Sequence, residues 1–312
     1  MTIFKADDFK PYTSLKAASA VKWWSLTILA TILAIIIAIL TFFVTENEQL
    51  LGIMIAICFP IAPFASGIVW LVRDVQFEKT KKQALFTTLD KLGWSRGVYP
   101  AINDWPVVPS SLLHNLEPGG IQAPVVARMQ GRLEHQPAEL VFLDARYFTS
   151  DGKSAFAYIH VALQDSYPHT IVDGNDGILR SDLVAKVRNV EKVLLEGNLA
   201  NQFHVYTVKG VGQDSLYTLT PDILVHILDY GTNFNVEIVG NSMYVLASPD
   251  HLQDSQKFAN FMNLALYLTQ QFGIRAKARG IKEGEFRYNP TYAQTRMDVS
   301  ISFIDPKDRR RL

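Results

Sequence analysis

Two long apolar runs without charge lie near the amino terminus of the chain. Residues 23–45 and 49–72 contain no Asp, Glu, Lys or Arg, and only Glu46, Asn47 and Glu48 separate them. At about 1.5 Å of rise per helical residue, each run is about 35 Å long, more than the roughly 30 Å of a bilayer's hydrocarbon core. The pattern predicts a transmembrane helical hairpin, and a buried helical hairpin in a soluble core is the alternative.

The charges that flank the two runs predict an orientation. Positive residues precede the first run and follow the second, whereas the connecting turn has none; they are Lys5, Lys10, Lys16, Lys22, Arg73, Lys79, Lys81 and Lys82. The positive-inside rule then places both termini in the cytoplasm. Trp23, Trp24 and Trp70 are expected as anchors at the membrane interface. The predicted location is the cell inner (plasma) membrane, as a multi-pass protein.

Small residues recur at helical spacing within both runs. Ala30, Ala34 and Ala38 form one stripe on the first run, and Gly52 and Ala56 form another on the second. Small residues allow helices to approach closely in lipid, so we expect these stripes to pack against each other, with a homo-oligomer as the alternative. Neither run holds an ionisable side chain, which disfavours a transport role. The expected partners are the lipid bilayer, a second copy and another membrane protein.

The chain after the second run alternates between strand-like and helix-like patterns. We expect a juxtamembrane amphipathic helix over residues 73–95, a domain over 96–306 and a basic tail over 307–312, with residues 1–22 as a cytoplasmic segment. β-branched and aromatic residues predict strands, and apolar spacing after Thr220-Pro221 and Ser248-Pro249 predicts helices. The second of these helices is expected to have one apolar face, formed by Phe258, Phe261, Met262, Ala265 and Leu268. The predicted fold class is an α+β cytoplasmic domain attached to an N-terminal transmembrane α-helical hairpin. Its expected strands are 125–133, 139–148, 155–163, 201–208, 235–239, 243–247 and a last one near 299–303; its expected helices are 181–195, 221–230 and 251–272.

Charge and cysteine content exclude several classes of function. The chain has 30 Lys and Arg against 30 Asp and Glu, so general attraction to nucleic acid is not expected. Its single cysteine, Cys58, lies within the second apolar run. A cysteine-based zinc site and an intramolecular disulfide are therefore excluded.

A set of short segments after residue 194 carries a family resemblance. Leu195-Glu196, Phe203-His204-Val205-Tyr206 and Leu216-Tyr217-Thr218-Leu219-Thr220-Pro221 occur in this order, followed by a helix and the strands around Val236 and Tyr244. Together with the two apolar runs, this order resembles the bacterial family known as domain of unknown function 3137. The resemblance covers the apolar runs and residues 190–272, and it implies two membrane helices and a cytoplasmic α+β domain. That family has no assigned catalytic residue, so the resemblance implies none.

Candidate chemistry in the chain is weak. The seven histidines, at 114, 135, 160, 169, 204, 226 and 251, show no metal-binding spacing, and His160 and His204 are expected as sheet residues. The run Asp173-Gly174-Asn175-Asp176-Gly177 lacks the ligand pattern of a calcium loop and is expected to be a polar turn. Gly210-Val211-Gly212 with Ser215 lacks the residues of a phosphate loop and is expected to connect two strands.

Three functions follow as hypotheses. The first is a membrane-anchored interaction or scaffolding module that is not an enzyme, because no catalytic or metal motif is present and no cofactor is expected. The second is an accessory subunit of a membrane transport or envelope complex, joined through the small-residue stripes. The third is an enzyme or small-ligand binder whose site the sequence does not reveal.

Overall fold

The computed structural model describes residues 4–15, 28–29, 32–33, 35–37, 39–40, 72, 75–77, 79–96, 110–112, 125–144, 155–174, 190–195, 197–230, 234–248, 251–289 and 291–292. The chain divides into two compact units. One comprises Met1–Thr13 and Phe86–Leu312, and the other comprises Ser14–Leu85. The fold and the candidate site described below belong to the first unit.

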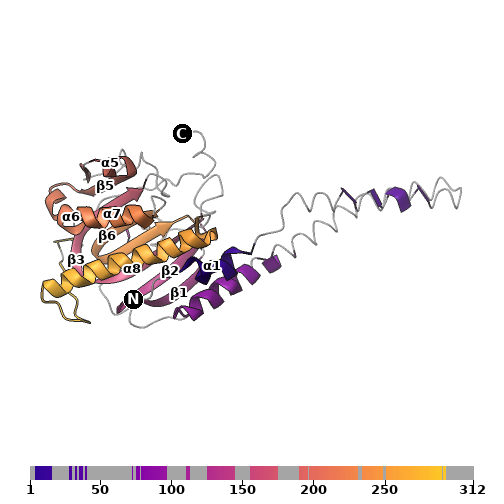
Figure 1. The fold of residues 1–312 in the computed structure, drawn as a ribbon, viewed down its shortest axis with the longest axis horizontal. Coiled ribbons are helices and arrows are strands. Elements are labelled where there is room, and N and C mark those ends of the chain that lie inside the picture. Colours follow the sequence, from indigo (N-terminus) through magenta and orange to yellow (C-terminus); the bar gives the residue numbers. More distant parts are fainter. Residues whose placement is uncertain are drawn as a thin grey trace. The chain divides into compact units, whose positions relative to one another are not determined.

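An antiparallel sheet of six strands forms the centre of this unit (Figure 1). Five strands follow one another in the order β1-β2-β3-β5-β4, and β6 pairs with β3. Their bounds are β1 Val125–Leu133, β2 Gln136–Asp144, β3 Ala155–Gly174, β4 Val190–Val193, β5 Phe203–Val208 and β6 Phe234–Ala247.

Strand β3 organises the sheet because every strand except β1 and β4 pairs with it. Its first part pairs with β2, from Ala155 to Val161, and its last part pairs with β5, from Thr170 to Gly174. Strand β6 pairs with both parts of β3. All fourteen residues of β6 are buried, so both of its faces lie within the core. The long apolar runs of β3 and β6 are typical of strands covered on both faces.

Helices α6, α7 and α8 cover one face of the sheet, with α8 running across the strands (Figure 1). The carboxylate of Asp254 caps α8 by accepting hydrogen bonds from the backbone N–H groups of Gln256 and Lys257 at 2.8 and 2.9 Å. The apolar face expected for this helix is confirmed, because its members are all buried: Phe258, Phe261, Met262, Ala265 and Leu268. The helical bounds are α5 Leu199–Gln202, α6 Gly212–Thr218, α7 Pro221–Tyr230 and α8 Ser255–Ala278, with a 3-10 turn at His251–Gln253.

The N-terminal arm, which we define as residues 4–13, packs on α8. It contains α1 (Ala6–Thr13), whose Phe9 is fully buried and stacks on Phe258 with ring centroids 4.2 Å apart. The side-chain amide of Asn263 accepts from the backbone N–H of Phe4 at 2.9 Å and donates to its carbonyl at 2.8 Å. One side chain thereby satisfies both backbone polar groups of a buried residue. The arm is thus part of the folded core.

The expected juxtamembrane helix is found in part. Residues 75–77 and 79–91 are helical, and Leu85 and Leu89 are buried. Gly93 follows at φ +85°, a left-handed conformation that glycine adopts readily at the end of a helix.

The prediction of a transmembrane hairpin has to be corrected. Residues 41–71 lie outside the described residues, as do Trp23, Trp24 and Trp70 and all five small residues, Ala30, Ala34, Ala38, Gly52 and Ala56. In the part of the chain that the structure describes, no helix is both long and apolar enough to cross a bilayer. The predicted fold class, with its N-terminal transmembrane hairpin, is therefore wrong, and so are the membrane character and the multi-pass inner-membrane location.

The physical reason is that absence of charge is only one requirement of a membrane span. A span also needs about 20 consecutive apolar residues in one helix. Among the described helices, only α8, with 24 residues, reaches that length, but Asn260, Gln270 and Gln271 interrupt its apolar character. The prediction took the helices from the sequence alone, and most of both runs lies outside the described residues.

Candidate functional site

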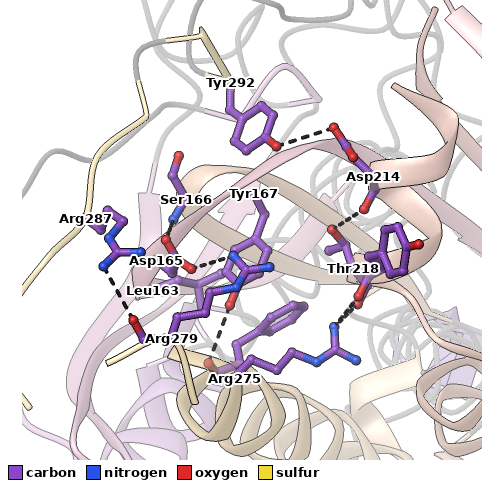
Figure 2. A network of polar contacts seen from close by, with 12 residues as sticks. Leu163, Asp165, Ser166, Tyr167, Asp214, Thr218, Arg275, Arg279, Arg287 and Tyr292 are labelled. Carbon is purple, nitrogen blue, oxygen red and sulfur yellow. Dashed lines mark hydrogen bonds and ion pairs between the residues drawn. The ribbon is translucent and has the colours of Figure 1, made fainter. Parts of the chain in front are cut away.

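A cleft of about 380 Å³ lies where α6, the end of α8 and the middle of β3 meet. Its volume falls in the range of small-molecule sites, which is about 300–1,000 Å³. The cleft is lined by positively and negatively charged side chains, by several hydroxyl groups and by aromatic rings (Figure 2). Its lining residues are Ser166, Tyr167, Pro168, Asp214, Tyr217, Thr218, Thr220, Arg275, Ala278, Arg279 and Tyr292.

A bulge in β3 places polar residues in the floor of this cleft. Ala162 pairs with Ser242 and Tyr167 pairs with Gly240, so residues 163–166 of β3 face only Asn241 of β6. The side-chain amide of Asn241 donates to the carbonyl of Leu163 at 3.2 Å and to that of Arg287 at 3.1 Å. Bulges redirect side chains and often lie beside functional sites. This one brings Asp165 and Ser166 to the end of α8.

Arg279 is oriented by a buried carboxylate. Its Nη1 lies 2.6 Å from Oδ2 of Asp165, a residue that is only 3 % exposed. The backbone N–H of Ser166 donates to the other oxygen of Asp165 at 2.9 Å. The hydrogen bond that Arg279 donates to Asp165 raises the pKa of Arg279. A guanidinium has five N–H donors, and this ion pair uses one of the five.

Arg275 is oriented without any carboxylate. Its Nη1 donates to the carbonyls of Tyr217 and Thr218, at 2.8 and 2.5 Å, and its Nη2 donates to Oγ1 of Thr220 at 3.1 Å. These carbonyls end helix α6, where the macrodipole favours a cation, so part of its role is structural. Burial lowers the pKa of Arg275. The three bonds leave two donors of this guanidinium for a ligand.

Asp214 supplies a carboxylate on the opposite wall. It lies in the first turn of α6, and the hydroxyl of Tyr292 is 3.5 Å from its Oδ2. The pKa of Tyr292 is raised by burial and by Asp214, and Arg279 opposes this rise. The pKa of Tyr292 therefore depends on both the carboxylate of Asp214 on α6 and the guanidinium of Arg279 after α8.

The hydroxyl of Ser166 is buried in the cleft floor and has no hydrogen-bond partner among the described residues. Leaving a buried polar group unsatisfied costs about 1–3 kcal/mol, so such groups in a folded protein call for an explanation. A ligand with an acceptor above Ser166 would supply the missing bond.

A second polar cluster, Ser111, His169 and Glu237, resembles a hydrolytic triad in composition but not in geometry. Oγ of Ser111 and Oε1 of Glu237 lie 3.1 and 2.8 Å from the same ring nitrogen, Nε2 of His169. In a triad, the hydroxyl and the carboxylate bind opposite nitrogens of the imidazole. His169 and Glu237 are also fully buried. The cluster therefore holds residues 110–112 against the sheet and does not form a nucleophilic site.

The glycine-containing segment expected as a loop between strands instead begins a helix. Gly210 has φ +88°, and α6 starts at Gly212. Ser215 is buried within hydrogen-bonding distance of Thr170 and Thr207. The prediction of a strand–strand connection was wrong, because these buried hydroxyl contacts to β3 and β5 stabilise a short helix that has no side-chain cap of its own.

Asp173 lies at the end of β3 and is buried. The side-chain amide of Asn235 donates to its Oδ1 at 2.7 Å. Burial raises the pKa of Asp173 to about 7, although the bond from Asn235 acts in the opposite direction. Residues 175–177 of the expected polar turn lie outside the described residues.

Changing Asp173 to Asn should remove a pH dependence of stability. The folded protein holds this proton more tightly than the unfolded chain, whose pKa is 3.8. The contribution is therefore fully present below pH 4 and is lost as the pH rises to about 7, by about a few kcal/mol in total. Urea unfolding from pH 4 to 8 should show the wild type losing its advantage over Asp173→Asn across this window. A constant difference would contradict the assignment, and Asp229→Asn, an exposed carboxylate, is the matched control.

The remaining predicted residues are placed as follows. His160 is on β3 and His204 on β5, as expected, and burial lowers the pKa of His160 to about 4. Among the described residues, no group of three or more His, Cys, Asp and Glu side chains is placed to hold a metal ion. Cys58 and His114 lie outside the described part of the chain. The cleft itself was not predicted, although the four-residue spacing of Arg275 and Arg279 in the sequence places both on one side of a helix.

Comparison with known proteins found no match: no protein-family model, no curated protein and no solved structure is significantly similar to this chain. The resemblance to domain of unknown function 3137 stays a prediction.

Proposed function

We propose that the folded unit is a recognition module that binds a small charged ligand in the cleft between α6, α8 and β3. The observation that carries this proposal is the pair of guanidinium groups, Arg275 and Arg279. Both line one cleft, both are held in place by other groups, and both keep unused donors. Donors that are fixed before binding lose little freedom on binding, which favours affinity.

The buried hydroxyl of Ser166 supports this function independently. It belongs to the β3 bulge, whereas the two arginines belong to the end of α8. Two elements therefore present polar groups to the same small volume, and apolar surface from Pro168 and Ala278 lies beside them. Ligand sites commonly combine a mainly apolar wall with a few well-placed polar groups.

This proposal corresponds to the ligand-binding hypothesis from the sequence and narrows it to one place. The interaction or scaffolding role and the accessory-subunit role stay predictions, as do the expected bilayer, second-copy and membrane-protein partners and the absence of enzymatic activity.

The test is a thermal-shift and calorimetric screen of the full chain with small charged metabolites, including citrate, inorganic phosphate, nucleotides and amino acids. A ligand present at 100 times its dissociation constant adds about 2.7 kcal/mol of stability. We expect at least one compound to bind, and its affinity to fall at least tenfold in Tyr217→Ser and in Arg279→Gln.

The choice of variants and of a control makes this screen decisive. Tyr217 is 75 % exposed, so its replacement leaves the fold and the Arg279–Asp165 pair intact, whereas Arg279→Gln leaves a buried carboxylate unpaired. Arg132→Gln, at an exposed position on β1, is the matched control and should bind as the wild type does. A screen without any binder, or binding that both cleft variants retain, would overturn the proposal.

A further inference from the structure

The lining of the cleft carries charges of both signs. Arg275, Arg279 and Asp214 line it, and the buried Asp165 contacts Arg279 from outside the lining. Asp165 is already paired with Arg279 at 2.6 Å. One cation, Arg275, and one carboxylate, Asp214, are left without an opposite charge among the described residues.

These two charged groups lie at opposite ends of α6, although Arg275 itself is a residue of α8. The Arg275 guanidinium binds the carbonyls that end the helix, at Tyr217 and Thr218, and Asp214 lies in its first turn. Residues 214 and 218 are four positions apart, which is about 6 Å along a helix. A single small molecule can span that distance.

The hydroxyl groups around each charge match opposite ligand groups. On the Arg275 side, Thr220 accepts from the guanidinium, so its own hydroxyl proton can be donated to a bound anion. On the Asp214 side, the oxygen of Tyr292 can accept from a bound cation. The Arg275 side of the cleft is therefore suited to a carboxylate, and the Asp214 side is suited to an ammonium group.

We propose that the ligand is a zwitterion of the amino-acid class, with its carboxylate on Arg275 and its ammonium group on Asp214. This inference rests on the proposed function and specifies its ligand. A dianion would be repelled by Asp214, and a simple cation would be repelled by Arg275 and Arg279, whereas a zwitterion meets an opposite charge at each end. Tyr167 and Pro168 offer apolar surface for a side chain between the two charges.

The test compares L-leucine with two analogues that each lack one charge. 4-Methylpentanoate has no ammonium group, and 3-methylbutylamine has no carboxylate. L-Phenylalanine and 4-aminobutyrate extend the set to a larger side chain and to a wider charge spacing. Affinities for the full chain are measured by titration calorimetry at low salt. We expect at least one of the three zwitterions to bind, and leucine to bind at least tenfold more tightly than either analogue.

Two variants assign the ends of the ligand. Asp214→Asn removes an exposed carboxylate, and we expect it to abolish the preference for a zwitterion over 4-methylpentanoate. Arg275→Lys keeps the charge but not the planar fork, and we expect it to weaken carboxylate binding at least tenfold. Asp229→Asn, an exposed position on α7, is the control and should leave both affinities unchanged.

The outcomes separate this inference from the proposed function. If 4-methylpentanoate binds as well as leucine, or if Asp214→Asn leaves the preference intact, the zwitterion is wrong. If citrate or phosphate binds in an Arg279-dependent way and no amino acid does, the recognition module stands and its ligand is an anion. If none of these compounds binds and the wider screen of charged metabolites also finds no binder, both proposals fail.

Discussion

Replacing Glu237 by alanine should lower the free energy of unfolding by about 3–5 kcal/mol, the range measured when one member of a buried charged pair is removed. The carboxylate is fully buried on β6, and its oxygens accept hydrogen bonds from the hydroxyls of Ser110 and Ser111 and from the backbone N–H groups of Ser111 and Leu112. His169 adds a contact of 2.8 Å. The variant would leave all of these buried groups without this acceptor.

Urea unfolding at neutral pH measures this loss, and its pH dependence provides a second readout. Burial alone would raise the pKa of Glu237, but the contact with His169 and the serine hydroxyls outweigh it and hold the pKa below 4.5. The stabilisation is therefore present above pH 4.5 and disappears as the pH falls, so the deficit of the variant should shrink in acid.

Two further variants make the result specific. Glu237→Gln keeps one acceptor oxygen and should cost less than the alanine variant. Glu283→Ala removes a carboxylate whose side chain is 62 % exposed, and it should change stability by less than about 0.5 kcal/mol. A Glu237→Ala variant within 1 kcal/mol of the wild type would show that residues 110–112 are not held in this way.

Phe258→Ala should cost a similar amount, about 3–5 kcal/mol, because it empties the contact between the N-terminal arm and α8. Phe258 is fully buried, and its ring stacks on Phe9 and meets Tyr12 and Phe142 edge-on. The loss should also release the arm, since Phe9 and Tyr12 would lose their main aromatic neighbour.

Chymotrypsin distinguishes release of the arm from general unfolding. Cleavage after Phe9 or Tyr12 should become faster in Phe258→Ala under conditions where the rest of the unit stays folded. Phe258→Leu keeps most of the buried volume and should show a smaller effect. Val225→Ala, at an exposed site on α7, serves as the matched control. Wild-type stability together with an unchanged cleavage rate would contradict this account of the arm.

Local patterns in the sequence were sufficient for several elements. β1 and α7 have the predicted bounds, Val125–Leu133 and Pro221–Tyr230. In both, alternation or helical spacing agrees with the residues at the ends, and Pro221 suits the first position of a helix. The buried face of α8 was predicted for the same reason.

Long-range pairing decided the elements that the sequence misrepresented. Gly240-Asn241-Ser242 is typical of a turn, and two separate strands, 235–239 and 243–247, were predicted on either side of it, yet β6 continues through it as one strand. The extra residues of β3 opposite Asn241 absorb the mismatch, and Asn241 binds two carbonyls from distant parts of the chain. No local pattern reports such contacts.

The candidate cleft also depends on contacts between residues that are far apart in the sequence. Asp165, Asp214 and Arg279 are each ordinary surface-type residues in the sequence, and they become a site only because the bulge of β3, helix α6 and the end of α8 meet. Glu237 did leave a signal, because a carboxylate between Val236 and Ile238 breaks an apolar strand. Buried charges of this kind require partners, but the sequence does not say which.

The attachment of the N-terminal arm also sets the order of events during synthesis on the ribosome. Phe4 is made before Asn263, which binds both of its backbone groups and lies 259 positions later in the chain. At about 5–20 residues per second, the arm waits on the order of ten seconds to a minute for its binding site. Contacts of such sequence separation form late and slowly. Phe9 and Tyr12 therefore lack their packing partner Phe258 until α8 has been made, and chaperones have access to them during that interval.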